Sequence, residues 1–330
     1  MQDYQQFSLG DFVLQSGEVL RQAKLAYATF GELNAQGDNA ILIPSYYTGT
    51  HRSYLKLIGA GRALDPRRYF IVLTNMFGNG VSSSPSHDGA QHGADFPTVS
   101  IKDNVNAQHL LSMSLGINAF ALVTGWSMGA MQAWQWAVSF PQQVKALLPV
   151  CGTARCWPLN HVFLEGIKGA LQADPVYHHG RYRTSPLAGL AAFGRVYAGW
   201  AYSAEFFRAA RYRDLGFETL EQLLQSWEKD HQNWDANNLL AMLATWQSGD
   251  VSLDAIAGVS AKTCVMVGST DRYFTPEEAR IEFDRLPANV GEWRPLVSPY
   301  GHCAGAPGRF ARETAEIECA ISELLRESCV

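Results

Sequence analysis

The chain has 330 residues, of which 47% are hydrophobic and 17% are charged, a composition typical of a globular protein with a large core. Its formal net charge of −5 argues against a nucleic-acid or anionic-membrane partner, because such partners require a basic surface. No apolar run approaches the length of a transmembrane helix, and the N-terminal residues lack the pattern of a secretory signal. Six cysteines in a chain of this length neither form a disulfide framework nor show the spacing of a zinc site. We therefore expect a cytoplasmic protein with reduced thiols and no bound metal.

Short apolar runs alternate with longer helical patterns along the chain, which is typical of an α/β fold. Two segments near the N-terminus, residues 7–15 and 25–30, are predicted to form a leading hairpin. Six further runs are predicted strands: residues 39–47, 69–76, 119–127, 145–153, 263–271 and 293–302. Most of these runs are almost continuously apolar, as expected for parallel strands that are covered on both faces. The sequence therefore predicts a mostly parallel central sheet.

The strand signal disappears between Cys156 and Ser260. Apolar residues recur there at helical spacing, in the two groups Leu220, Leu223, Leu224, Trp227 and Leu239, Leu243, Trp246. A helical insertion of this size predicts a cap over the carboxyl edge of the sheet, where open α/β sheets bind their ligands. We expect a core of residues 1–155 and 261–330 and a helical cap of residues 156–260.

The segment GWSMG, residues 125–129, places a serine between two glycines, where a predicted strand ends and a predicted helix begins. This is the pattern of a nucleophile elbow, a turn so tight that close backbone contacts exclude side chains at both glycine positions. An elbow holds the serine oxygen at a helix N-terminus, whose dipole favours the anion that forms on attack. The pattern alone is weak evidence because it also arises by chance, but its position makes Ser127 the candidate nucleophile.

A serine hydroxyl needs a base to remove its proton and a third group to orient that base. His302 follows the last predicted strand on a glycine-rich loop, and Asp271 follows the strand before it. Taken singly, such an aspartate is a common turn former and such a histidine is commonly a solvated loop residue. The chain order Ser127, Asp271, His302 is that of hydrolases with a nucleophile elbow, and it predicts a catalytic triad.

Other catalytic patterns fail in this sequence. The segment FGNGVSSS lacks the third glycine of a dinucleotide site, because Ser83 occupies that position. No H-E-x-x-H zinc motif occurs. Glu277 and Glu278 fall where a helix is expected to begin, and compensation of the helix dipole accounts for them.

Two segments of the chain resemble those of a known family. The run DFPTVSIKD (95–103) and the elbow GWSMGAMQAWQWA (125–137) are the most specific, within a likeness from about residue 57 to 207 that resumes around Asp271 and His302. On these residues the chain resembles the homoserine O-acetyltransferase family of α/β-hydrolase-fold enzymes. The resemblance implies a serine that passes an acyl group to a second molecule, a cap that mediates a homodimer, and no metal.

The same resemblance implies roles for individual residues. Ser127, Asp271 and His302 fall on the family's triad, and the loop SYYTG (45–49) falls where the family has an oxyanion loop. The backbone amides of Tyr47 and Met128 are then the expected oxyanion donors. The tyrosine side chains of that loop either line the pocket or serve ordinary packing.

The sequence departs from the family pattern at positions that are expected to contact the substrate. Trp126 and Ala130 replace two glycines of the family's elbow, and Cys303 stands where the family places an aspartate that can hold an ammonium group. An unperturbed thiol is mostly protonated near neutral pH and supplies no such charge. Arg195 and Tyr202 match an arginine and a tyrosine of the family's cap, and an arginine there suits a carboxylate, although a structural role for it stays open. The candidate substrate-binding residues are thus Arg195, Tyr202, Trp126 and Cys303.

Three interpretations follow from these residues. The favoured one is a carboxylesterase-like hydrolase that acts on a small acyl ester or thioester through an acyl-enzyme, because the ammonium-binding aspartate is missing. The alternative is an O-acyltransferase that uses an acyl-CoA as co-substrate. A binding or scaffolding protein without turnover is the third, and the intact triad order argues against it. None of the three requires a bound cofactor.

Overall fold

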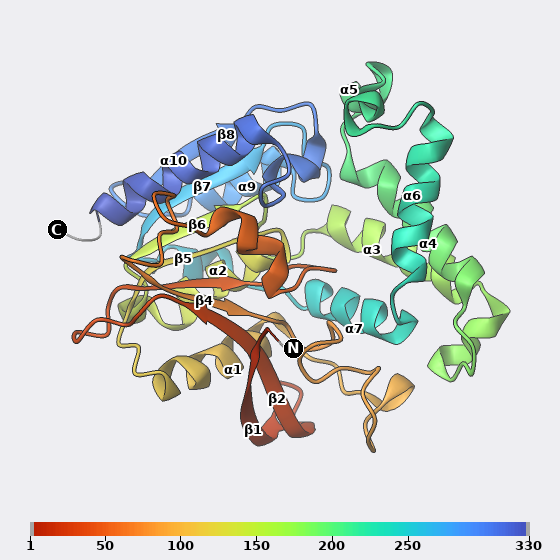
Figure 1. Ribbon diagram of the computed structural model, residues 1–330, viewed down its shortest axis with the longest axis horizontal. Coiled ribbons are helices and arrows are strands. Elements are labelled where there is room, and N and C mark those ends of the chain that lie inside the picture. Colours follow the sequence, from red (N-terminus) through yellow and green to blue (C-terminus); the bar gives the residue numbers. More distant parts are fainter. Residues whose placement is uncertain (1–2, 328–330) are drawn as a thin grey trace.

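The computed structural model describes residues 3–327 (Figure 1). Within this range eight strands form one sheet with the order β1-β2-β4-β3-β5-β6-β7-β8. Strands β1 and β2 run antiparallel at one edge, and the neighbours from β4 to β8 are parallel. The strands are β1 (Gln5–Val13), β2 (Val19–Phe30), β3 (Ala40–Pro44), β4 (Phe70–Thr74), β5 (Phe120–Trp126), β6 (Ala146–Val150), β7 (Lys262–Gly268) and β8 (Gly291–Leu296). The predicted mostly parallel sheet and its leading hairpin are confirmed.

Helices cover both faces of the sheet. Those outside the insertion are α1 (Ile101–Ser114), α2 (Met128–Ser139), α9 (Pro276–Phe283) and α10 (Ala311–Glu327). Ile41 of β3 packs in a hydrophobic cluster with α10, and the next residue, Leu42, packs in a cluster with α1 and α2. Successive side chains of a strand point to opposite faces, so a continuously apolar strand is what two helical layers require. No helix within residues 3–327 is long and apolar enough to cross a membrane.

The predicted strands end earlier than their apolar runs. Strand β3 ends at Pro44, yet Ser45 and Tyr47 beyond it are still buried. The ring of Tyr47 stacks on Tyr197 of the insertion, with ring centroids 5.6 Å apart. The apolar run therefore continues past the strand because the cap covers the loop that follows it.

The insertion between β6 and β7 is helical, as predicted. It contains α3 (Pro158–Gln172), α4 (Leu187–Ala201), α5 (Ala204–Arg208), α6 (Leu220–Gln232) and α7 (Ala236–Gln247). These helices gather on one side of the sheet, at the right of Figure 1. The short helix α8 (Leu253–Ile256) follows, and Val251, Ile256 and Val259 around it pack in the hydrophobic cluster of the sheet and its helices.

Candidate active site

Ser127 lies on the sharp turn between β5 and α2. Its backbone angles, φ 59° and ψ −125°, are strained for a residue with a side chain. A Cβ atom on Gly125 would lie 2.6 Å from the backbone carbon of Gly129, and one on Gly129 would lie 2.7 Å from the carbonyl oxygen of Pro44. These contacts explain why both flanking positions are glycine, and they place Ser127 on a nucleophile elbow.

His302 and Asp271 meet beside this elbow. Nδ1 of His302 lies 2.7 Å from Oδ2 of Asp271, and both side chains are buried. The other oxygen of Asp271 accepts hydrogen bonds from the backbone N–H groups of Tyr273, at 2.8 Å, and Phe274, at 3.2 Å. Since the carboxylate can only accept, Nδ1 carries the proton and Nε2 is left as the basic nitrogen of the ring.

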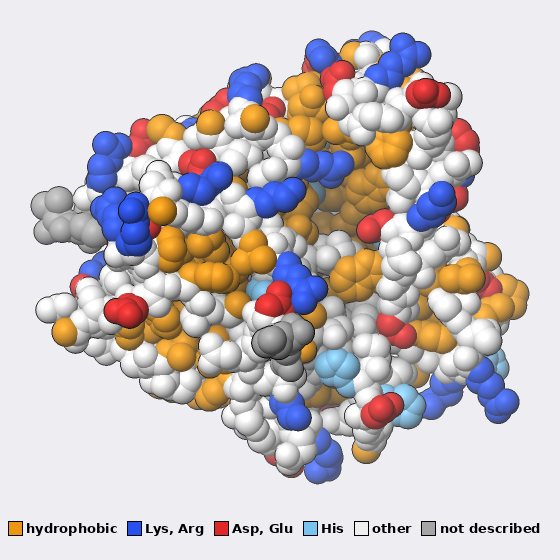
Figure 2. Space-filling model, viewed as in Figure 1, with side chains coloured by type: hydrophobic (Ala, Val, Ile, Leu, Met, Phe, Trp, Pro, Cys, Tyr) orange, Lys and Arg blue, Asp and Glu red, His pale blue; other side chains and the backbone are white. Residues whose placement is uncertain are grey.

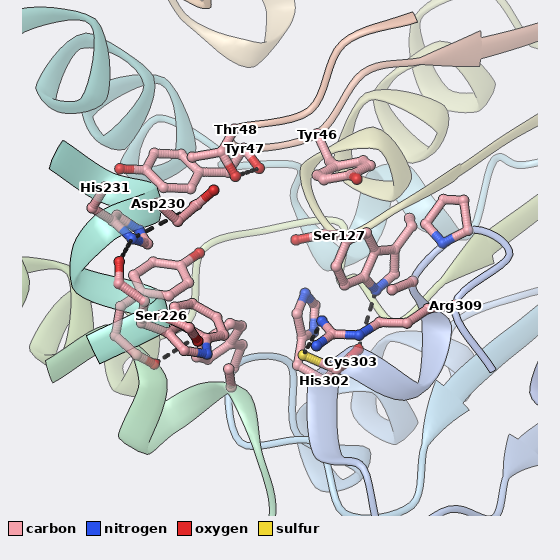
Figure 3. Close-up of a pocket in the computed structure, with 17 residues that line it drawn as sticks. Tyr46, Tyr47, Thr48, Ser127, Ser226, Asp230, His231, His302, Cys303 and Arg309 are labelled. Carbon is pink, nitrogen blue, oxygen red and sulfur yellow. Dashed lines mark hydrogen bonds and ion pairs between the residues drawn. The ribbon is translucent and has the colours of Figure 1, made fainter. Parts of the chain in front are cut away.

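Two aromatic rings fix the orientation of the imidazole. The indole of Trp126 is stacked on His302, and the ring of Tyr273 lies on it at a centroid distance of 4.5 Å. Figure 3 shows Ser127 and His302 at the same cavity, with the serine hydroxyl directed into it. The structure thus brings together the three residues that the sequence predicts to form a triad.

The cavity lies between the core and the cap and has a volume of about 450 Å³. Figure 2 shows it as a hollow whose visible wall is largely hydrophobic. Its walls are aromatic on both sides, with Tyr46, Tyr47 and Trp126 from the core and Tyr197 and Trp227 from the cap. The tyrosine side chains of the loop 45–49 therefore line the pocket, one of the two roles that the sequence left open. A site of this size suits a small organic substrate.

The amides of Tyr47 and Met128 lie at the carboxyl ends of β3 and β5. Met128 is the first residue of α2, so its N–H has no partner within the helix. Neither amide donates a hydrogen bond to any residue in the described range 3–327. Both groups are thus available to a ligand oxygen, although their role in an oxyanion hole stays a prediction.

Two of the predicted substrate-binding residues, Trp126 and Cys303, line the cavity. Cys303 is 3% exposed, and burial raises the pKa of its thiol, while the nearby Arg309 acts in the opposite direction. The thiol is therefore neutral at pH 7 and supplies no fixed negative charge beside His302. This agrees with the chemistry expected from its sequence position.

The predicted role of Arg195 is wrong. Its guanidinium binds Glu221, at 2.7 and 3.1 Å, and also Glu228, both on α6, and Arg195 does not line the cavity. Two carboxylates already neutralise this cation, and they hold it between α4 and α6. Arg195 ties α4 to α6 at a place outside the cavity.

Arg309 is a cavity residue that the sequence interpretation missed. It lines the cavity, and its Nη2 donates a hydrogen bond to the hydroxyl oxygen of Tyr202 at 2.7 Å. Tyr202 itself is fully buried and does not line the cavity, but its hydroxyl group contacts Arg309, which does. One feature of the sequence could have identified Arg309. It follows the predicted base His302 by seven residues, in the segment GHCAGAPGR, so a cation was to be expected near that base.

No group of three or more His, Cys, Asp or Glu side chains in the described part of the chain is arranged to hold a metal ion. A buried histidine–carboxylate pair beside a strained serine suits nucleophilic attack on an acyl carbonyl.

Comparison with known proteins shows the family of the chain. A model of the alpha/beta hydrolase fold matches residues 40–305. The chain belongs to this family. Among similar relatives of this α/β hydrolase is the ethyl acetate hydrolase of Pseudomonas veronii, 38% identical over 335 residues that cover 98% of this chain and 95% of the relative.

Solved structures and more distant relatives agree with this placement. The acetyl esterase MekB is 38% identical and superposes with a TM-score of 0.94 over 98% of this chain and 96% of that chain. The homoserine O-acetyltransferase of Leifsonia xyli subsp. xyli is 32% identical over 335 residues, which cover 89% of this chain and 83% of the relative. The predicted fold and the predicted resemblance to the homoserine O-acetyltransferase family are both confirmed.

Proposed function

We propose that this α/β hydrolase is a carboxylesterase-like enzyme that hydrolyses small acyl esters through an acyl-enzyme. Its catalytic triad is Ser127, His302 and Asp271. The observation that carries the proposal is the buried hydrogen bond of 2.7 Å between His302 and Asp271, on a ring that shares a cavity with the Ser127 elbow. The two relatives named for acetyl-ester hydrolysis support a short acyl group.

Acylation is the first half of the reaction. Ser127 Oγ attacks the carbonyl carbon of the ester while Nε2 of His302 takes the hydroxyl proton. The carbonyl oxygen becomes an oxyanion, which the amides of Tyr47 and Met128 stabilise. The bond to the alcohol oxygen then breaks, and His302 gives its proton to the departing alcohol.

Deacylation repeats the same steps with water. His302 takes a proton from a water molecule, which attacks the acyl carbon, and the bond to Ser127 Oγ breaks as the serine regains a proton. Asp271 holds the imidazole in the required tautomer and stabilises the imidazolium in both halves. The acid leaves and the free enzyme is restored.

The second candidate is an O-acyltransferase with an acyl-CoA donor, supported by the 32% identity to a homoserine O-acetyltransferase. Hydrolysis is favoured because the neutral thiol of Cys303 supplies no counter-charge for the ammonium of an amino-acid acceptor. The cytoplasmic location and the homodimer formed through the cap stay predictions from the sequence.

The test measures acetate release from ethyl acetate by the wild type, Ser127→Ala and Ser260→Ala. Ser127→Ala should lose several orders of magnitude in turnover, as removal of a triad nucleophile does, whereas the exposed Ser260 should be replaceable without loss. A fluorophosphonate should label Ser127 and no other residue. An adduct on another residue would refute the assignment.

A second measurement separates the two candidates. The wild type is given acetyl-CoA or ethyl acetate with and without homoserine, and acetate and O-acetylhomoserine are quantified by mass spectrometry. We expect acetate as the main product in every case. Efficient formation of O-acetylhomoserine would instead establish the transferase.

A further inference from the structure

Arg309 brings a positive charge into the cavity. Its Nη1 lies 3.5 Å from Sγ of Cys303 and its Nη2 lies 2.7 Å from the hydroxyl oxygen of Tyr202. Its guanidinium carbon is 5.7 Å from the ring centroid of Tyr202 and 5.5 Å from that of Phe310. No carboxylate within residues 3–327 forms an ion pair with it. Two rings and two polar contacts thus hold a cation in place.

The guanidinium retains the capacity to bind a ligand. An arginine has five N–H donors, and two of them are used by Cys303 and Tyr202. The side chain is open to the solvent of the cavity. Figure 3 shows Arg309 beside Cys303 and His302, on the core side of the cavity. The planar fork of an arginine suits a carboxylate, which can accept two parallel hydrogen bonds from it.

An acidic side chain on the opposite wall of the cavity forms no ion pair with Arg309. Asp230 of α6 also lines the cavity, on the cap side, and its side chain is 66% exposed. The imidazole of His231 lies beside it, with Nδ1 3.7 Å from the Asp230 carboxylate, and burial lowers the pKa of that imidazole. The cavity therefore has a cation on the side of His302 and an exposed anion on the side of the cap.

We infer that Arg309 makes this site selective for esters whose alcohol part carries a carboxylate. The inference rests on the proposed esterase function. His302 must deliver a proton to the alcohol oxygen, so the alcohol lies on the side of the histidine. Arg309 contacts Cys303, the residue after His302, and is therefore near the alcohol part of the ester. The substrate class is an acylated hydroxy acid.

The test compares three acetyl esters of matched length: 3-acetoxypropanoate, 3-acetoxypropanamide and 3-acetoxypropylammonium. In the wild type, kcat/KM should be highest for the carboxylate and lowest for the ammonium. Arg309→Gln should lower the carboxylate-to-amide ratio of kcat/KM by about fivefold to tenfold, a modest effect because the cavity is open to solvent. High salt should lower the same ratio in the wild type, since salt screens the attraction.

Two variants serve as controls. Arg309→Lys keeps the charge but not the planar fork, so its ratio should fall between those of the wild type and Arg309→Gln. Arg195→Gln removes a cation that lies outside the cavity, and it should keep the ratio of the wild type. An unchanged ratio in Arg309→Gln, or an equal loss in Arg195→Gln, would overturn the inference.

A second pair of esters tests which side of the ester Arg309 recognises. Monoethyl succinate carries its carboxylate in the acyl part, and ethyl succinamate carries a neutral amide at the same position. If Arg309→Gln affects only this second pair, the assignment to the alcohol part is wrong.

Calorimetric titration of 3-acetoxypropanoate into Ser127→Ala gives a readout that needs no turnover. Adding Arg309→Gln to that background should weaken binding by at least about fivefold. Equal binding with and without Arg309 would overturn the inference even if the wild type proved to be no esterase.

Discussion

The indole of Trp126 lies nearly parallel to the imidazole of His302, with ring centroids 4.9 Å apart and planes at 23°. Its Nε1 also donates a hydrogen bond to the carbonyl oxygen of His302 at 3.2 Å. A Cβ atom on Gly305 would lie 2.7 Å from Cδ1 of Trp126, so the loop after His302 accepts the indole only because that position is glycine. Trp126 therefore positions the base while it lines the cavity.

Trp126→Ala should lower kcat about threefold to tenfold, because a stacked aromatic contact stabilises its partner by about 0.5–1.5 kcal/mol. Trp126→Phe keeps a ring but loses the hydrogen bond, and it should retain more activity than the alanine variant. The measurement is kcat and KM for ethyl acetate in both variants. A change confined to KM would mean that Trp126 only lines the cavity.

Asp271→Asn should lower kcat by about four orders of magnitude. The asparagine oxygen is needed to accept from the backbone N–H groups of Tyr273 and Phe274, so its NH₂ group would face Nδ1 of His302. That arrangement favours the tautomer with the proton on Nε2, which cannot act as the base. Asp284→Asn, an exposed position at the end of α9, is the matched control and should keep full activity. A fully active Asp271→Asn enzyme would refute the role of Asp271.

Cys303→Asp should raise the ratio of O-acetylhomoserine to acetate by about tenfold, because one charge-assisted hydrogen bond to an ammonium is worth about 1–3 kcal/mol. Nη1 of Arg309, 3.5 Å from Sγ, would keep the new carboxylate ionised. Cys303→Asn has nearly the same shape without the charge and should leave the ratio unchanged. The acceptor 4-hydroxybutanoate has no ammonium, so transfer to it should not rise. An equal rise for both acceptors would exclude ammonium binding as the cause.

Glu282 of α9 gives stability a dependence on pH. Its carboxylate is buried, and it accepts from the N–H of Ala154 at 2.7 Å, the N–H of Arg155 at 3.3 Å and the indole of Trp157 at 2.9 Å. Burial outweighs these donors and raises the pKa of Glu282 from 4.5 to about 7. Between pH 4.5 and pH 7, therefore, Glu282 is protonated in the folded protein and ionised in the unfolded chain. The stability linked to this proton is present below pH 4.5 and is lost as the pH rises through 7.

Glu282→Gln should remove that dependence. The free energy of unfolding of the wild type, relative to the variant, should fall by an amount on the order of 3 kcal/mol between pH 4.5 and pH 7. Urea unfolding at several pH values measures the difference. Glu277→Gln, at an exposed position of the same helix, should keep the pH dependence of the wild type. Parallel curves for the wild type and Glu282→Gln would contradict the raised pKa.

The sequence identifies the three candidate triad residues because each stands at the end of an apolar run, and the structure places each of them beyond the end of a strand, β5, β7 or β8. It does not reveal which face of a cap helix an arginine occupies, so Arg195 matched a family position while its side chain turns toward the acidic face of α6. Arg309 and Glu282 escaped prediction for a related reason. Their partners are 107 and 128 residues away in the chain, Tyr202 and Ala154, and no local pattern encodes such contacts.

The cap is inserted between two strands that are neighbours in the sheet, β6 and β7. Its two stems are joined where they leave the core: Arg155 and Asp250 form an isolated bridge, and the N–H of Cys156 donates to the carbonyl of Gly249 at 2.8 Å. The outgoing stem is anchored to α9 by Glu282. The chain thus leaves the core and returns to it at one place. Tyr197 and Trp227 of the cap line the cavity, so a change in the cap would alter the cavity wall without altering the loops after β5, β7 and β8 that carry Ser127, Asp271 and His302.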